Sequence, residues 1–348
     1  MRDRQFSLLR IPLSRYCTKI DSRCRGSPMQ HVSLPSLSPT VLMDEGWIEW
    51  NKEKWGLRAE RFEYEADGRG GAKLVGWLYL NSRGNVCMPG MHPYMPLVFT
   101  GTDTGRWSKR YRQWMSVADQ FAADLARRGV AGELLMPPGA IDLRPLQWRG
   151  FRIGVRYTTA LSFPLDFSRF DEDVMKQVRK AQRQGYTVHE SADWDLVEHC
   201  LGHSERRKRF SHRLCATDLS QLHQRLGRSR FRAFIGYGPA GQPVCAQLRL
   251  FAPGSTAIGW AASTQSNHLR SGVNQLTYLE GLRALAADGV TGIDLCGSNI
   301  PSVAAAKANW GGPLVPYLTV RQPGARFVRA AIREALAWYR HSWCMRWQ

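Results

Sequence analysis

The feature that most constrains the fold is the alternation of strand-like and helix-like patterns in the second half of the chain. Two runs rich in branched and aromatic residues, 231–237 and 244–251, flank a turn sequence and predict a β-hairpin. The elements predicted next are a strand over 256–262, a helix over 273–288, a strand over 292–295, a short helix over 302–309, a strand over 314–321 and a terminal helix over 325–343. Antiparallel strands followed by strand–helix–strand units predict a mixed α/β sheet.

The first half of the chain shows the same alternation. Residues 72–80 predict a strand that ends at a turn cluster, and residues 133–136 predict a short buried strand. Between them, residues 107–128 carry apolar side chains at three- and four-residue steps, and Gly129 follows where a helix cap is expected. This segment predicts an amphipathic helix.

Residues 1–42 have a different composition from the rest of the chain. They hold seven basic residues against two acidic ones, followed by a Ser/Pro-rich stretch over 33–39. No apolar core of about 7–15 residues follows the charges, which argues against a secretory signal. We interpret residues 1–42 as a basic, disordered leader; a transit peptide, or a later start at Met29 or Met43, stays open.

The charge balance indicates anionic partners. Lys and Arg number 48 against 29 Asp and Glu, which gives a formal charge of +19 and a pI near 10.0. Such a charge favours nucleic acid, phosphorylated cofactors or an acidic membrane surface. No apolar run approaches the roughly 18 residues of a membrane span. Eight scattered cysteines without a C-x-x-C pair argue against a disulfide framework or a thiolate zinc site. We therefore expect a soluble, cytoplasmic protein.

The sequence lacks the motifs of several classes of enzyme. The sequence has no G-x-S-x-G elbow and no Walker loop, which argues against serine hydrolases and P-loop nucleotidases. His199 and His203 have the i, i+4 spacing of a helical metal pair, but Glu198 precedes His199, so the H-E-x-x-H arrangement is missing. We expect no metal site.

Five strings of sequence follow one another over residues 137–317. They are Pro137–Trp148 with Arg156–Thr159, Val178–Gly185, Asn274–Gly289, Ile293–Ser298, and Lys307–Gly312 with Val315–Tyr317. In content and order these strings resemble the motifs of the FemAB-like branch of the GNAT acyltransferase superfamily. The resemblance implies two tandem GNAT-like subdomains flanking a substrate cleft. We place them at residues 43–165 and 166–348.

The resemblance also implies a reaction. Members of the family transfer an acyl group to an amine and take it from an aminoacyl-tRNA or an acyl thioester. No tightly bound cofactor is implied. The helical-hairpin arm that some members carry is missing, because no long charged heptad segment is present.

Two residues are the candidate catalytic groups. Lys307 lies where the family places a lysine near the reacting carbonyl, and its ammonium would stabilise the oxyanion; alternatively it is a solvated surface lysine. Asp294 ends a predicted buried strand, where a carboxylate can accept the amine proton or cap the next helix. Gly297 and Ser298 are candidates to offer backbone N–H groups to a phosphate or an acyl oxygen.

Residues 270–274 are the candidate donor-binding turn. Arg270, Gly272 and Asn274 stand where acyl-CoA users of the superfamily carry a glycine-rich pyrophosphate turn before a helix, and helix N-termini attract phosphate. Only one glycine is present. We therefore favour aminoacyl-tRNA over acyl-CoA as the donor.

Basic clusters on two predicted helices suggest a phosphate-binding surface, although charge runs are commonly solvated helix faces. We assign acceptor or tRNA binding to Arg179, Lys180, Arg183, Arg206, Arg207, Arg209, Trp148 and Tyr157.

The sequence as a whole predicts a transferase that forms an amide bond. Its donor would be an aminoacyl-tRNA, and its acceptor a small-molecule or nucleotide-linked amine such as a cell-wall precursor or a natural-product intermediate. Two alternatives stay open: an acyl-CoA-dependent N-acyltransferase, and a non-catalytic RNA- or envelope-binding protein. Peripheral contact with a membrane also stays open.

Overall fold

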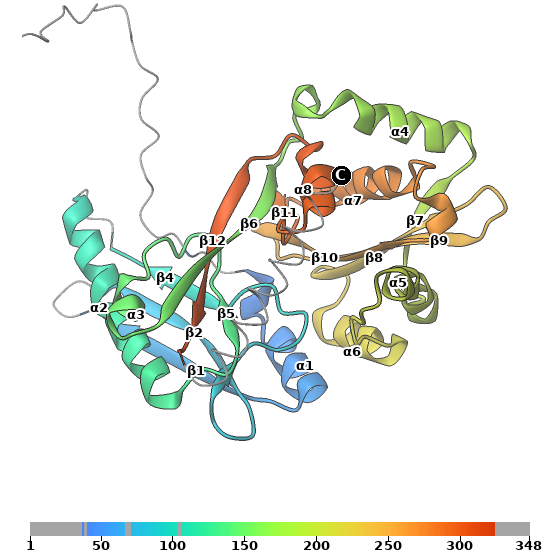
Figure 1. Ribbon diagram of the computed structural model, residues 1–348. Helices are drawn as coiled ribbons and strands as arrows, with labels where there is room; N and C mark the ends of the chain where they lie inside the picture. The colour runs from blue at the N-terminus through green and yellow to red at the C-terminus, as the bar shows by residue number, and fades with distance from the viewer. Residues whose placement is uncertain (1–36, 38–39, 67–70, 103–105, 324–348) are drawn as a thin grey trace, which may run out of the picture. The chain divides into compact units, whose positions relative to one another are not determined.

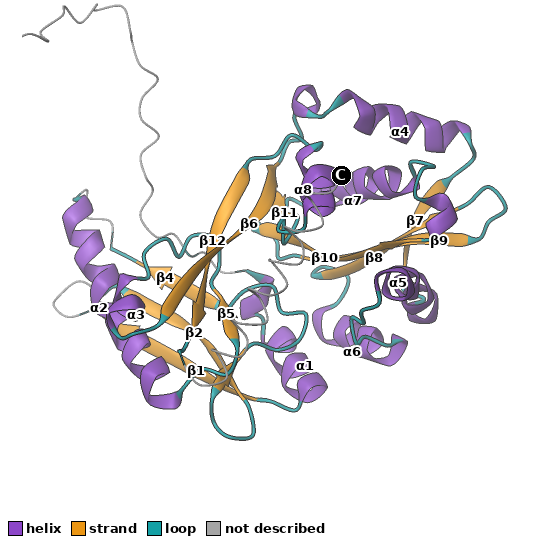
Figure 2. Cartoon of the chain, viewed as in Figure 1, coloured by secondary structure: helices purple, strands orange, loops and turns teal. Residues whose placement is uncertain are grey.

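The computed structural model describes residues 37, 40–66, 71–102 and 106–323, all within one compact unit that spans residues 34–348. These residues form two β-sheets with flanking helices (Figures 1 and 2). The predicted terminal helix over 325–343 and most of the predicted leader lie outside the described residues. Within the predicted leader, Val41 and Leu42 are buried in the core, so the folded part begins before residue 43.

The smaller sheet is antiparallel and lies in the first third of the chain. Its strands are β1 (Arg58–Glu65), β2 (Lys73–Leu80), β3 (Val86–Cys87) and β4 (Leu97–Thr100), and β2 pairs with each of the other three. Helix α2 (Trp107–Arg128) has the predicted bounds and packs its apolar stripe, including Phe121, against the strand residue Phe62. This contact follows from the three- and four-residue spacing of the apolar side chains.

The larger sheet has eight strands. In spatial order these are β5 (Glu133–Leu135), β12 (Leu314–Arg321), β6 (Arg152–Ser162), β11 (Gly292–Asp294), β10 (Thr256–Thr264), β9 (Pro243–Leu250), β8 (Phe231–Tyr237) and β7 (Thr187–Ser191). The β10–β11 pair is parallel and the other pairs are antiparallel. The predicted hairpin is β8–β9, and the predicted mixed α/β sheet is confirmed.

Helices cover both faces of the larger sheet. Helices α4 (Glu172–Arg183) and α7 (Val273–Ala287) lie on one face, and α5 (Trp194–Lys208) and α6 (Ala216–Leu226) on the other (Figure 1). A separate hydrophobic cluster fills each side. The remaining elements are η1 (Val41–Met43), α1 (Glu45–Trp55), α3 (Arg144–Trp148), η2 (Phe167–Arg169), η3 (Ser266–His268) and α8 (Pro301–Ala308).

The two halves of the chain interlock through the larger sheet. Strand β6 pairs with β12 along residues 152–159 and with β11 along residues 160–162. Strand β5 also pairs with β12. Strands from both predicted subdomains therefore share one sheet, which the alternation of elements did not indicate. The boundary between residues 165 and 166 stays a prediction.

Helix α1 also connects the two halves. The Trp50 indole donates a hydrogen bond to the backbone carbonyl of Asp218 in α6 over 2.8 Å, and Lys54 pairs with the Asp218 carboxylate. The Trp47 and Trp50 rings pack edge-on against Trp260 of β10. In the part of the chain described here, no helix combines the length and low polarity needed to cross a bilayer.

Candidate functional site

The candidate site is built around the end of strand β11. This strand is buried between β6 and β10 and ends at Asp294. The chain then turns through Cys296, whose φ of 56° is in the left-handed region. The Asp294 carboxylate stabilises this turn by accepting the Cys296 N–H over 2.7 Å. A local turn thus holds a carboxylate at the strand end.

Two side chains from distant parts of the sequence also bind the Asp294 carboxylate. The Tyr94 hydroxyl donates to it over 2.8 Å, and the Thr158 hydroxyl of β6 donates to its other oxygen. Burial raises the pKa of Asp294, while the Thr158 and Tyr94 hydrogen bonds oppose the rise. A buried carboxylate with a raised pKa is suited to accept a proton.

Asp294 lies in the wall of a pocket of about 610 Å³. Most of its lining is apolar, with Tyr94, Thr158 and Asp294 among the polar groups. The pocket is lined by Leu37, Thr40, Leu42, Tyr94, Met95, Leu97, Pro137, Pro138, Gly139, Thr158, Ala160, Pro253, Gly254, Ser255, Thr256, Ile258, Thr291, Asp294 and Val315. A largely apolar pocket with a few converging polar groups is typical of a small-molecule site.

Lys307 lies next to this pocket without lining it. From α8 its ammonium donates to the backbone carbonyls of Cys296 and, over 2.9 Å, of Gly297. Burial lowers the pKa of Lys307, and Cys296 and Asp294 oppose that change. The lysine therefore stabilises the turn that follows Asp294, and its oxyanion role stays a prediction.

Some of the backbone groups of Gly297 and Ser298 already form hydrogen bonds within the protein. The Ser298 N–H donates to the Tyr157 carbonyl over 2.7 Å, and its hydroxyl lies 2.9 Å from the Thr159 hydroxyl. The Gly297 carbonyl accepts from Lys307. Of the two N–H groups assigned to donor binding, the one at Ser298 is therefore already used.

The Arg270–Asn274 turn leads into α7 as predicted and packs against α4. Gly272 is the N-cap of α7 with φ +89°, and a Cβ there would lie 2.1 Å from the Gln177 carbonyl oxygen. The Arg270 carbonyl accepts from Lys180 over 2.8 Å. Close packing on α4 thus explains the glycine without a bound phosphate.

Polar side chains of β9 form a buried network that sequence reasoning missed. Gln247 donates to the backbone and side-chain oxygens of Asn274, both over 3.1 Å, and accepts from Arg249. The Arg249 guanidinium is 1% exposed, lies 4.4 Å from the Tyr278 ring centroid and leaves its Nε without a partner. Gln247 and Arg249 alternate in an otherwise apolar strand, a signal that could have flagged them.

This network gives the region an excess of positive charge. Lys307, Arg249 and Asp294 interact electrostatically with Cys296, and Arg249 helps to lower the pKa of Lys307. Arg249 is buried and Lys307 is half-buried, and neither forms an ion pair with a carboxylate among the residues that the structure describes. Because burying an unpaired charge is costly, the arrangement favours an anionic group such as a developing oxyanion.

The predicted basic clusters lie on opposite faces of the larger sheet, because α4 and α5 do. Lys180 nevertheless donates to the Arg270 carbonyl in the loop between β10 and α7, and Arg207 donates to the carbonyl of Thr264, at the end of β10 where that loop begins, over 2.7 Å. We call this surface the basic edge; it comprises Arg179, Lys180, Arg183, Arg206, Arg207, Arg209 and Arg270. Arg209 ends α5 in the left-handed conformation, with φ 53°.

Trp148 and Tyr157 do not line the pocket. Trp148 ends α3 and is 67% exposed. Tyr157 is exposed on β6, and its N–H donates to the Asn299 side chain over 2.8 Å. The next residue, Thr158, reaches Asp294 because successive side chains of a strand point to opposite faces.

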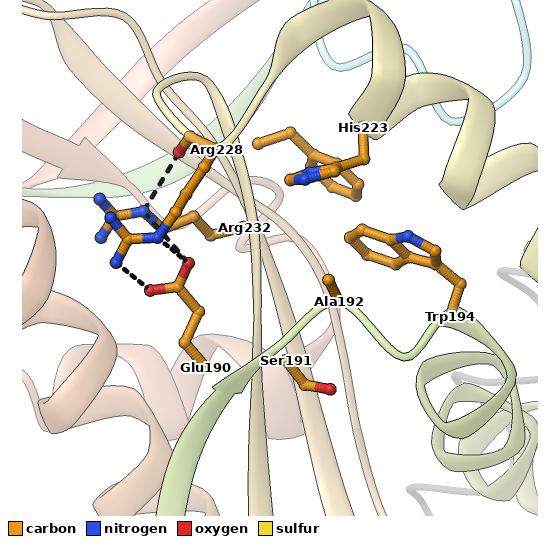
Figure 3. A pocket seen from close by; sticks show the side chains of 8 residues that line it. Glu190, Ser191, Ala192, Trp194, His223, Arg228 and Arg232 are labelled. Carbon is orange, nitrogen blue, oxygen red and sulfur yellow. Dashed lines mark hydrogen bonds and ion pairs between the residues drawn. The ribbon is translucent and has the colours of Figure 1, made fainter.

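A second hollow of about 380 Å³ lies at the end of β7 (Figure 3). Glu190 there accepts two hydrogen bonds of 2.6 Å from Arg228 and lies 3.7 Å from Arg232, which also pairs with Asp288. The arginines are thus already paired with carboxylates. The Asp294 pocket is the better candidate for chemistry.

Residues 168–302 match the family model of the acetyltransferase (GNAT) domain. A search of curated protein sequences gives no match.

Solved structures with a similar fold include FemX, with a TM-score of 0.57 and 14% identity over 83% of this chain and 94% of that chain. A second is the C-terminal domain of a protein from Agrobacterium fabrum described as a putative lysylphosphatidylglycerol synthetase. Its TM-score is 0.53 and its sequence identity 12%, over 85% of this chain and 94% of that chain. A third is L-PGS from Bacillus licheniformis, with a TM-score of 0.50 and 10% identity over 86% of this chain and 98% of that chain. At these identities the likeness shows the fold, and the predicted tandem GNAT-like fold is confirmed.

Proposed function

Because this chain contains a GNAT acetyltransferase domain and has the fold of FemX, we propose that it is an acyltransferase that joins an aminoacyl group to an amine. The observation that carries the proposal is the buried Asp294 carboxylate, which Tyr94 and Thr158 hold in the wall of a largely apolar pocket. The acceptor amine would bind in this pocket.

The reaction follows from the groups at the site. Asp294 takes a proton from the acceptor ammonium, and the free amine attacks the carbonyl carbon of the aminoacyl ester. A carbon–nitrogen bond forms and the ester carbon–oxygen bond breaks. One of the two protons that the nitrogen loses passes to the leaving 3′-oxygen of the tRNA, and the other is released from Asp294 to solvent. The ammonium of Lys307 and the positive charge of Arg249 favour the negative charge that develops on the carbonyl oxygen.

Two observations support an aminoacyl-tRNA donor. Two residues of the basic edge, Lys180 and Arg207, bind the chain near the two ends of the segment that leads into α7, and a polyanion would bind there. In addition, one protein of similar fold is described as a lysylphosphatidylglycerol synthetase, and its product by that name carries an aminoacyl group. An acyl-CoA donor remains the alternative, because a helix N-terminus also suits a pyrophosphate.

The test is enzyme-dependent amide formation from labelled aminoacyl-tRNA or from labelled acetyl-CoA, with butylamine, a primary amine that is protonated near neutral pH, as the surrogate acceptor. We expect product from aminoacyl-tRNA, and we expect Asp294→Asn to lower the rate by at least about 100-fold. Asp142→Asn is the matched control, since Asp142 lies outside the pocket. Product from acetyl-CoA alone would favour the CoA alternative. Equal rates for wild type and Asp294→Asn would remove the proposal.

A further inference from the structure

Two exposed tryptophans on the N-terminal half belong to one ordered stack. The Trp107 ring stacks on Tyr111 at a centroid distance of 5.3 Å and an interplanar angle of 6°. The Arg144 guanidinium lies 5.4 Å from the Tyr111 centroid and 6.0 Å from that of Trp148. We call Trp107, Tyr111, Arg144 and Trp148 the aromatic stack.

The stack leaves large apolar side chains in solvent. Trp107 is 59% exposed and Trp148 is 67% exposed, while Ile141, three residues before Arg144, is 49% exposed. Such a concentration of exposed apolar side chains marks a site of protein–protein or membrane contact. An indole combines an apolar ring with a polar N–H, and it is therefore favoured where hydrocarbon meets water.

The surface that carries the stack is held rigidly. The Trp114 indole of α2 donates to the Asp142 carbonyl over 2.8 Å, which joins the helix to the segment that bears Ile141. The Asp142 carboxylate accepts from Arg144 over 3.0 and 2.8 Å. These hydrogen bonds fix the position of Arg144, whose guanidinium lies over the Tyr111 and Trp148 rings.

The charge around the stack is positive. Segments 106–119 and 141–149 contain six basic residues against two acidic ones. Lys109 and Arg112 are exposed, and neither forms an ion pair with any residue that the structure describes. These side chains complement an anionic surface.

We infer that the aromatic stack, with Ile141 and the neighbouring basic residues of α2, docks the protein on an anionic lipid bilayer. The indoles and Ile141 would enter the interfacial layer, and Lys109 and Arg112 would contact lipid phosphates. Stable peripheral binding needs an apolar and a cationic contribution together, and this face has both.

A bilayer explains this face better than a nucleic acid does. Arg144 is already bound by Asp142 and lies over two rings, so it offers little to an RNA phosphate. Ile141 is aliphatic and gives no platform for stacking a base. Lipid contact uses the indoles and the aliphatic side chain alike.

The test is co-sedimentation of the full chain with vesicles of phosphatidylglycerol and phosphatidylcholine at a 3:7 ratio, compared with pure phosphatidylcholine. We expect binding to the anionic vesicles, and at least a tenfold loss of it in Trp107→Ser/Trp148→Ser. Lys109→Glu/Arg112→Glu should lose binding to a similar extent. The matched control is Phe167→Ser/Leu314→Ser, which removes two side chains that are 45% and 59% exposed elsewhere; it should bind as the wild type does.

Two outcomes would overturn the inference. One is equal binding of wild type and Trp107→Ser/Trp148→Ser to the anionic vesicles, with near-UV circular dichroism showing both proteins folded. The other is a loss of affinity for single-stranded poly(U) in that variant while vesicle binding persists, which would make the stack an RNA-binding platform. Neither readout depends on the proposed amide-forming activity.

Discussion

Lys307 is the residue on which the catalytic step can be tested most directly. If its ammonium stabilises the oxyanion, Lys307→Ala lowers kcat by roughly 100-fold while KM changes little, because the charge develops mainly in the transition state. Lys307→Arg rescues only part of the rate, since a planar guanidinium places its donors differently from an ammonium. Single-turnover amide formation, recorded beside the melting temperature, measures both effects. Near-normal turnover in a folded Lys307→Ala protein would contradict the oxyanion role. Lys307 would then only stabilise the turn after Asp294.

Tyr94 sets the pH dependence of the proposed base. Its hydroxyl stabilises the ionised form of Asp294 and so lowers the pKa of that carboxyl, against the rise caused by burial. The base acts when ionised, so the rate rises with pH through this pKa. Tyr94→Phe removes the donor, and the acid limb of the kcat/KM profile should move to higher pH by about one unit. Tyr64→Phe, which removes a hydroxyl donor to Asp124, is the control and should leave the limb in place.

The sequence pointed to Asp294 as a candidate base but not to the residues that bind its carboxylate. Asp294 could be predicted because a short apolar run ends there. Tyr94 could not, since it lies 200 residues away and no local periodicity links the two. On β6 the prediction chose Tyr157, whereas Thr158 reaches the pocket. A shift of one residue changes the face of a strand, and composition alone does not fix that register.

At the scale of elements, substitution of Gly272 in the turn before α7 tests whether this glycine is needed for packing against α4 or for phosphate binding. Gly272→Ala puts a Cβ against the Gln177 carbonyl in addition to the strain of a positive φ. Gly241 also has a positive φ, +76°, but a Cβ there would meet open space. Gly241→Ala therefore introduces only the backbone strain of a positive φ, which costs about 1–2 kcal/mol. We expect Gly272→Ala to lower the free energy of unfolding by at least about 2 kcal/mol more than Gly241→Ala. Urea denaturation of both variants measures the difference; equal losses would contradict the packing role.

Elements with strong local signals were predicted well. Helix α2 has the predicted bounds, because its apolar stripe and the glycine that follows it both act locally. The hairpin β8–β9 and the strand β12 were also found. The pairing of β12 with both β5 and β6 was not predicted, because it joins segments more than 150 residues apart. Such pairing depends on tertiary packing and not on propensity.

At the scale of the whole molecule, a net charge of +19 becomes informative once the structure shows where the basic residues gather. The clusters of α4 and α5 lie on different faces of the larger sheet, yet one contacts the loop between β10 and α7 and the other contacts the end of β10 where that loop begins. A long polyanion can follow this edge of the sheet, whereas a small pyrophosphate would use only part of it. We therefore propose tRNA rather than CoA as the carrier of the donor group.

This preference predicts a steep dependence of tRNA binding on salt. Each phosphate that a lysine or arginine neutralises releases counterions, which adds about 0.7–0.9 to the negative slope of log K against log salt concentration. Arg183→Ala and Arg206→Ala, one from each cluster, should each reduce the slope by roughly that amount. Arg83→Ala, in the turn between β2 and β3, is the matched control and should leave the slope unchanged. Filter binding of total tRNA between low and moderate salt measures all three variants. If neither edge variant changes the slope, the basic edge is not a tRNA surface. If calorimetry shows tight binding of acetyl-CoA and filter binding shows no tRNA affinity at low salt, the result favours an acyl thioester as the donor.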